Sequence, residues 1–200
     1  MTRGAPRVWQ RMLSGRRLDL LDPSPLDVEI EDIAHGLARV ARWNGQTRGP
    51  HVFSVAQHCV LVEALVEALA PPAPGRALRL HALLHDAPEY VVGDMISPFK
   101  AVIGDAYKAT EKRILGAILL RYGLPPAPPP GVARLLKTAD RAAAFFEATR
   151  LAGFAKSEAE RVFGRPRVAP GDLDGLLEPV SPEDAQARFL QRFRAVDGTG

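Results

Sequence analysis

Residues 54–69, SVAQHCVLVEALVEAL, predict the central helix of the fold. Ser54 and Gln57 have the S-x-x-Q spacing of a capping box, in which the serine oxygen accepts a hydrogen bond from a backbone N–H at the helix start. Apolar residues then recur at helical spacing until Pro71, which cannot continue a helix. His58 is therefore expected in the first turns of this helix.

Helical spacing of apolar residues also predicts helices on both sides of residues 54–69. These expected helices cover residues 30–41, 76–86, 105–122, 132–154 and 181–196. A short β-hairpin is expected from residues 8–13 and 17–21, and loops are expected at 90–101 and 164–179. The chain is therefore predicted to be all-α, with a short peripheral hairpin near its N-terminus.

Length and composition limit the kinds of site that the chain can build. It has 200 residues, of which 46% are hydrophobic, and this fits one domain. Cys59 is the single cysteine, so an internal disulfide and a thiolate zinc cluster are excluded, and any metal must be bound by histidine and carboxylate ligands. The basic residues behind the net charge of +3 are spread along the chain, so the charge gives only weak support for nucleic-acid binding and fits a small anionic substrate equally well. We expect no signal peptide, no membrane span and a cytoplasmic location.

Three of the expected helices carry side chains that could bind one metal ion. His58 lies at the start of one helix, His85 and Asp86 at the end of the next, and Asp140 in the middle of a third. Asp140 has small and apolar neighbours, and burying an unpaired carboxylate is costly. A divalent metal held by two imidazoles and two carboxylates would pair this charge and leave positions open for water and substrate. The alternative is a set of unrelated helix caps and core polar residues.

The order of His58, His85-Asp86 and Asp140 resembles the H…HD…D ligand set of the HD-domain metal-dependent phosphohydrolases. The similarity extends through SVAQH (54–58), ALLHDAPE (82–89), GD (93–94), SPFK (97–100) and KTAD (137–140). Within this superfamily the chain looks closest to the bacterial 5′-deoxynucleotidases and related small nucleotide hydrolases. The resemblance implies an HD-domain helical bundle. Its expected parts, within a single domain of residues 1–200, are a core at 26–155, a hairpin extension at 1–25 and a C-terminal loop and helix at 156–200.

The resemblance also implies a cofactor and roles for individual residues. The ligands His58, His85, Asp86 and Asp140 would hold one divalent transition metal (Mn, Co, Zn, Fe or Ni), and a further Mg²⁺ or Mn²⁺ could arrive with the substrate. Glu89 and Asp94 would handle the protons of water and the leaving group, whereas Arg42, Trp43 and Lys100 would contact the substrate. Arg42 and Trp43 are expected to end the first helix.

The proposed catalytic residues and two of the proposed substrate contacts also have structural explanations. Glu89 and Asp94 could be ordinary solvated carboxylates of a loop. Arg42 and Trp43 could simply form a helix end, with Trp43 packed on the core instead of against a sugar or base.

Together these features favour a metal-dependent phosphohydrolase that releases phosphate from (deoxy)nucleoside 5′-monophosphates or cleaves (deoxy)nucleoside triphosphates. An alarmone hydrolase would need a Glu-Asp pair shortly after the His-Asp doublet, where this chain has Ala-Pro-Glu (87–89). A nucleotide-binding regulatory module with a retained metal is the non-enzyme alternative, and it has no use for both Glu89 and Asp94. The resemblance further implies a homodimer or higher homo-oligomer, with a small nucleotide as partner and neither nucleic acid nor membrane.

Overall fold

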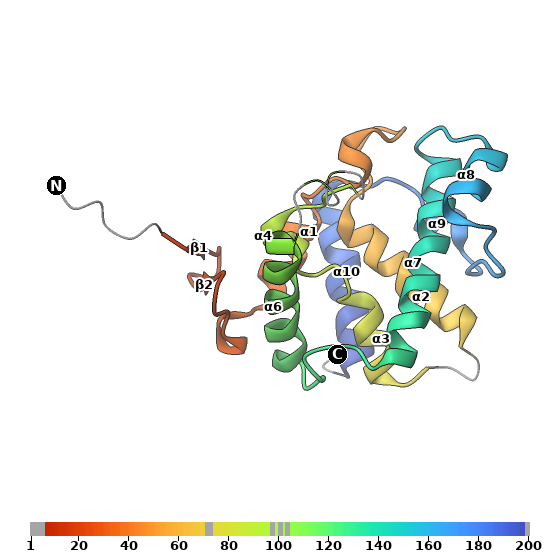
Figure 1. Cartoon of the computed structure of the whole chain (residues 1–200). Coiled ribbons are helices and arrows are strands. Elements are labelled where there is room, and N and C mark those ends of the chain that lie inside the picture. The colour runs from red at the N-terminus through yellow and green to blue at the C-terminus, as the bar shows by residue number, and fades with distance from the viewer. Residues whose placement is uncertain (1–6, 71–73, 97–98, 100–101, 103–104, 199–200) are drawn as a thin grey trace.

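The structure, a computed structural model, describes residues 7–70, 74–96, 99, 102 and 105–198. Over these residues the fold is all-α with one short antiparallel hairpin, as predicted (Figure 1). The strands are β1 (Trp9–Arg11) and β2 (Arg17–Asp19), and the 3₁₀ turns are η1 (Pro25–Asp27) and η2 (Arg42–Gly45). The helices are α1 (Ile30–Leu37), α2 (Val55–Leu69), α3 (Arg76–Leu83), α4 (Glu89–Val92), α6 (Asp105–Arg121), α7 (Pro130–Arg150), α8 (Lys156–Phe163), α9 (Leu173–Leu176) and α10 (Pro182–Asp197). No helix in this described part of the chain is both long and apolar enough to cross a membrane.

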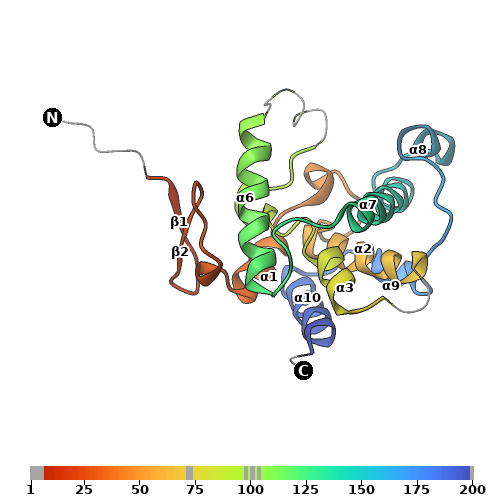
Figure 2. The same ribbon diagram turned by 60° about the horizontal axis from the view of Figure 1, so that its bottom comes forward.

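The helix α2 lies in the middle of the bundle, in contact with α3, α7 and α10 (Figures 1 and 2). Its start has the predicted cap, because the Ser54 hydroxyl accepts a hydrogen bond from the Gln57 backbone N–H at 3.3 Å. Leu61 and Leu65 are fully buried, and burying a side chain of this kind contributes ~1.5–3 kcal/mol. His58, in the first turn, is 0% exposed, so the fold places an imidazole in its interior.

The helix α3 ends at Leu83, earlier than the predicted residue 86. Pro88 disfavours helical geometry in the residue before it, and the chain forms turns from Leu84 to Pro88, the residue that precedes α4. His85 and Asp86 therefore lie in the connection between α3 and α4, where neighbouring side chains can face the same side. The predicted loop at 90–101 is wrong for residues 90–92, which belong to α4.

The helix α1 also ends early, at Leu37, and the prediction that Arg42 and Trp43 end the first helix is wrong. Ala41 forms an antiparallel bridge with Ser54 instead. The Arg42 backbone N–H donates a hydrogen bond to the Phe53 carbonyl oxygen at 2.8 Å. The turn η2 follows, and two of its residues are left-handed: Trp43 has φ 57° and Asn44 has φ 50°. This conformation is rare for a tryptophan, so contacts elsewhere must hold it.

The N-terminal hairpin lies at the α6 side of the molecule, far from α8 (Figures 1 and 2). Leu18 on β2 is fully buried against the main core. Ser14, in the hairpin turn, donates its backbone N–H to one carboxylate oxygen of Asp32 at 3.0 Å and its hydroxyl to the other at 2.5 Å. The hairpin is thus attached to α1 by both apolar and polar contacts.

The C-terminal part contains more helix than predicted. The helix α9 falls inside the loop expected at 164–179, and α8 precedes it. Ala159 of α8 is fully buried in a cluster with Phe145 of α7, and Phe189 of α10 is fully buried in the main core. Packing therefore continues beyond residue 155, the last residue of the core expected from the sequence.

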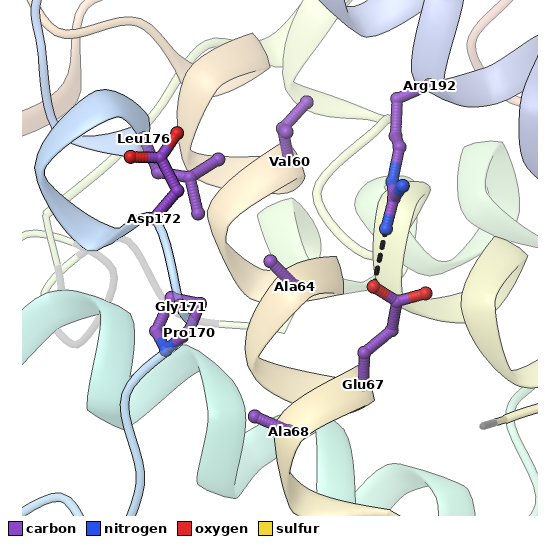
Figure 3. A pocket seen from close by; sticks show the side chains of 9 residues that line it. All are labelled: Val60, Ala64, Glu67, Ala68, Pro170, Gly171, Asp172, Leu176 and Arg192. Atoms are coloured by element: carbon purple, nitrogen blue, oxygen red, sulfur yellow. Dashed lines mark hydrogen bonds and ion pairs between the residues drawn. The ribbon is translucent and has the colours of Figure 1, made fainter.

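A buried charged cluster joins α2, α3 and α10. Glu63 is fully buried, and its two oxygens accept hydrogen bonds from Arg79 Nε at 2.7 Å and Arg192 Nε at 2.5 Å. Glu67 binds the same two guanidinium groups at 3.0 and 2.7 Å. We call this group of four residues the Glu63 cluster. Two of them, Glu67 and Arg192, line a groove of about 420 Å³ between α2, α9 and α10 (Figure 3). Of the predicted site residues that the structure describes, none lines this groove.

Candidate metal centre

The structure brings together the four residues predicted as metal ligands. One ligand atom each from His58, His85 and Asp86 lies within 4.8 Å of the others. An oxygen of Asp86 is 3.4 Å from His58 Nε2 and 3.3 Å from His85 Nε2. Asp140, on α7, joins the group through its Oδ1, which is 3.3 Å from His58 Nε2. Three separate elements thus contribute to one centre.

The two imidazoles fit a metal because each directs an unsatisfied nitrogen into this centre. The carbonyl oxygen of Ala82 can only accept, so His85 Nδ1, 2.8 Å away, carries a proton and Nε2 is the nitrogen that can bind a metal. Both Nε2 atoms are buried, and within the described residues neither has a hydrogen-bond partner. A buried imidazole nitrogen without a partner is costly, and a divalent ion such as Zn²⁺ would remove that cost.

Asp140 is less buried than its sequence neighbours suggest. Its side chain is 43% exposed, compared with 23% for Asp86 and 0% for His58. The centre is therefore closed on the α2 side and open along α7. A water or a substrate oxygen can approach from the exposed side.

Glu147 is a member of the site that the sequence analysis missed. It is fully buried on α7, seven residues after Asp140, so both side chains lie on the same face of that helix. Its Oε1 lies 2.5 Å from His58 Nδ1, and its Oε2 accepts hydrogen bonds from Trp43 Nε1 at 2.8 Å and Arg42 Nε at 3.3 Å. The signal that could have identified Glu147 is this seven-residue spacing, with the apolar residues 142–146 directly before Glu147.

The predicted substrate contacts lie on the other side of Glu147. Arg42 pairs through Nη1 with Asp94 Oδ2 at 3.2 Å, and both side chains are largely buried. The Trp43 ring lies edge-on to Phe154 and Phe163, with centroid distances of 5.7 and 5.8 Å. Trp43 therefore has extensive protein contacts of its own.

The remaining predicted residues are placed in part. Glu89 begins α4 and is 1% exposed. Lys100 lies outside the described residues. Cys59, next to His58 in sequence, is fully buried with its thiol beside the His85 imidazole, and burial raises the pKa of this thiol.

The charges of the site shift the pKa values of its members. Burial and the Arg42 guanidinium disfavour the charged form of His58. The carboxylates of Glu147, Asp140 and Asp86 outweigh both and raise the pKa of this imidazole well above its ordinary value. Burial also opposes the charge of Glu147, yet Arg42 and His58 hold the pKa of Glu147 at about 2. A metal that binds His58 must therefore displace a proton.

Sequence comparisons find similar proteins in two bacteria. No family model matches the chain. An uncharacterized protein of Rhodobacter capsulatus is 59% identical over 193 residues, covering 95% of this chain and 96% of that protein. The uncharacterized protein YfdR of Escherichia coli K12 is 38% identical over 100 residues, which is 50% of each chain.

One solved structure is similar over most of its length. The HD phosphohydrolase DatZ of cyanophage S-2L, determined with dA and one catalytic Zn²⁺ ion, matches with a TM-score of 0.52 and 17% identity over 86% of this chain and 98% of its own. At this identity the match shows the fold. The helical bundle thus has the fold of DatZ over most of its length, and the chain belongs to the same family as the Rhodobacter capsulatus protein.

Proposed function

We propose that this protein is a metal-dependent phosphohydrolase that acts on nucleotides. The observation that carries the proposal is the convergence of two buried imidazole Nε2 atoms, without hydrogen-bond partners in the described structure, on two carboxylates. The metal ligands would be His58, His85, Asp86 and Asp140. A metal held there lowers the pKa of a bound water and withdraws charge from a phosphoryl oxygen.

We assign substrate binding to the side of the site that contains Arg42. Its guanidinium can grip a phosphate with parallel hydrogen bonds, a geometry that lysine lacks. Its present partner Asp94 would share it with an incoming phosphate. The solved structure of DatZ contains dA, which supports a nucleoside as the rest of the substrate.

We assign proton handling to Glu89 and Asp94. Glu89 lies three residues after the ligand Asp86 and is almost completely buried, and Asp94 follows α4 with a side chain that is 8% exposed. Carboxyl groups in such a site can donate a proton to the departing oxygen or accept one from the attacking water.

The resemblance favours the release of phosphate from (deoxy)nucleoside 5′-monophosphates, with triphosphate cleavage as the other reaction. We further propose a cytoplasmic homo-oligomer of chains that are each one domain. The sequence motifs that resemble the 5′-deoxynucleotidases are the support for these finer points.

A substrate screen tests the proposal. Nucleoside mono- and triphosphates would be incubated with protein loaded with Mn²⁺, Co²⁺, Zn²⁺ or Mg²⁺, and orthophosphate, pyrophosphate and triphosphate would be measured. We expect orthophosphate from monophosphates with a transition metal. Tight nucleotide binding without any product, under every metal, would instead support a regulatory module.

A further inference from the structure

Glu147 has no role in the reaction proposed above, yet it touches both halves of the site. One carboxylate oxygen lies against His58 Nδ1, and the other accepts hydrogen bonds from the side chains of Arg42 and Trp43. All three donors meet a side chain that is 0% exposed. One buried carboxylate thus joins a proposed metal ligand on α2 to proposed substrate contacts in η2.

The contact with Glu147 determines which nitrogen of His58 faces the other ligands. Nδ1 is 2.5 Å from Glu147 Oε1, so Nε2 is the ring atom directed at Asp86 and Asp140, 3.4 and 3.3 Å away. A carboxylate at Nδ1 keeps the proton there and increases the basicity of Nε2. Glu147 therefore fixes both the tautomer and the direction of the ring.

The same carboxylate holds η2 in its left-handed conformation. Trp43 and Asn44 have φ values of 57° and 50°, which persist only where surrounding contacts over-determine them. The Trp43 indole N–H bond to Glu147 is one such contact. Arg42 bonds Glu147 through Nε and Asp94 through Nη1, so the direction of its guanidinium depends on Glu147.

We propose that Glu147 is a positioning residue that sets metal affinity through His58 and phosphate affinity through Arg42 and Trp43. The metal half rests on the proposed set of four ligands and on the contact between His58 and Glu147. The phosphate half rests on the proposed function, because it takes Arg42 as the phosphate contact.

A matched pair of variants tests the metal half. Glu147→Gln and Glu63→Gln each remove one buried charge that an arginine binds, but among the described contacts Glu63 bonds only Arg79 and Arg192. The dissociation constant for Zn²⁺ would be measured against a chromophoric chelator, together with the visible absorption of the Co²⁺-loaded protein. We expect Glu147→Gln to bind Zn²⁺ ~10–100-fold more weakly and to shift the Co²⁺ spectrum. Glu63→Gln should lower the melting temperature and leave both readouts unchanged.

Wild-type zinc affinity and an unchanged Co²⁺ spectrum in Glu147→Gln would overturn this half. If that variant does not fold, the ¹⁵N chemical shifts of the histidine rings in the zinc-loaded wild-type protein decide instead. We expect His58 to be protonated at Nδ1 and metal-bound at Nε2. The opposite tautomer contradicts the inference.

A second variant tests the phosphate half. Trp43→Phe keeps an aromatic ring beside Phe154 and Phe163 and removes the N–H that bonds Glu147, together with part of the indole ring. The dissociation constant for inorganic phosphate would be measured by calorimetry with the zinc-loaded protein. We expect both Trp43→Phe and Glu147→Gln to weaken phosphate binding severalfold, and Trp43→Phe to keep wild-type zinc affinity. Unchanged phosphate affinity in both variants would overturn this half.

These readouts separate the inference from the proposed function. A wild-type protein that binds zinc and phosphate but hydrolyses no nucleotide would refute the function and leave the variant comparison valid. If the wild-type protein hydrolyses nucleotides and Glu147→Gln has the same rate, zinc affinity and phosphate affinity, the inference is refuted and the proposed function stands. A wild-type protein that binds no zinc or other divalent metal contradicts the metal half.

Discussion

Glu63 and Glu147 are both fully buried glutamates on central helices, and they differ in what binds them. Both partners of Glu63 are arginines, and the guanidinium groups of both also bind Glu67. Figure 3 shows the contact between Arg192 and Glu67. The partners of Glu147 also contact other residues of the site. His58 directs its second ring nitrogen to the candidate metal centre, and Arg42 donates from a second nitrogen to Asp94.

This difference separates a buried charge that joins helices from one that orients reactive groups. A carboxylate bound only by arginines gives stability to the helices that carry them. A carboxylate bound to an imidazole determines which of two nitrogens is free, and this matters only if something binds there. The two regions should therefore respond differently to mutation, and each of the following predictions tests that contrast.

The largest effect is expected on turnover. Glu89→Gln and Asp94→Asn should each lower kcat by ~10²–10⁴-fold, because proton transfer by a positioned group contributes this much. Metal content, measured by elemental analysis, should stay at the wild-type level. Glu67→Gln in the Glu63 cluster is the control and should keep kcat. Parent-level rates in both site variants would mean that the chemistry takes place elsewhere.

The next effect is on stability. Glu63→Ala should lower the free energy of unfolding by about 2–3 kcal/mol, since two hydrogen bonds to a charged group are lost while the freed arginines can still reach water. The arginine side chains are 22% and 30% exposed, which limits the loss. Urea denaturation measures it, and zinc affinity should not change. A simultaneous loss of zinc affinity would contradict the separation of the two regions.

The third effect is a pH dependence of metal binding. The pKa of His58 is raised well above its ordinary value, so a proton competes with the metal between about pH 6.5 and that raised pKa. Apparent affinity should rise with pH by up to about tenfold per unit in this window. In the metal-free protein the same proton stabilises the fold, fully below about pH 6.5, and this contribution is lost as pH rises through the raised pKa. Chelator competition from pH 6 to 9 measures the affinity, and a flat profile would contradict the sign.

The smallest effect is expected at the hairpin, far from both glutamates. Ser14→Ala removes the hydroxyl that bonds Asp32 and should cost ~1–1.5 kcal/mol of stability without changing kcat or zinc affinity. Ser24→Ala, at the exposed cap of η1, is the control and should cost less. Any loss of zinc affinity in Ser14→Ala would show that the hairpin influences the centre.

Local sequence signals predicted α2 and most other helices because their causes are local. The Ser54 cap, the apolar pattern and Pro71 lie within one segment. The non-helical conformation at Ala41 could not be predicted in this way, since Ala41 forms a bridge with Ser54, which belongs to another segment of the chain. The same holds for the left-handed Trp43, which only contacts from α7 and beyond can stabilise.

The candidate site shows the same division. His58, His85, Asp86 and Asp140 were predictable because motifs mark them, and the structure places them together. Their roles as ligands stay a prediction. Glu147 has no motif of its own, and its importance appears only when α2, α7 and η2 are packed together. Residues that orient a site are thus harder to find from sequence than the residues that a motif marks.

The rate at which a thiol reagent modifies Cys59 can report how often this centre opens. It is the single cysteine of the chain and is fully buried. It follows the proposed ligand His58 in sequence, and its thiol lies beside the proposed ligand His85. A thiol reagent can reach it only when the first turn of α2 leaves the core, so the labelling rate counts those openings. An ion that holds His58 and His85 together should make the openings rarer. The labelling rate of Cys59 should therefore fall when metal is bound.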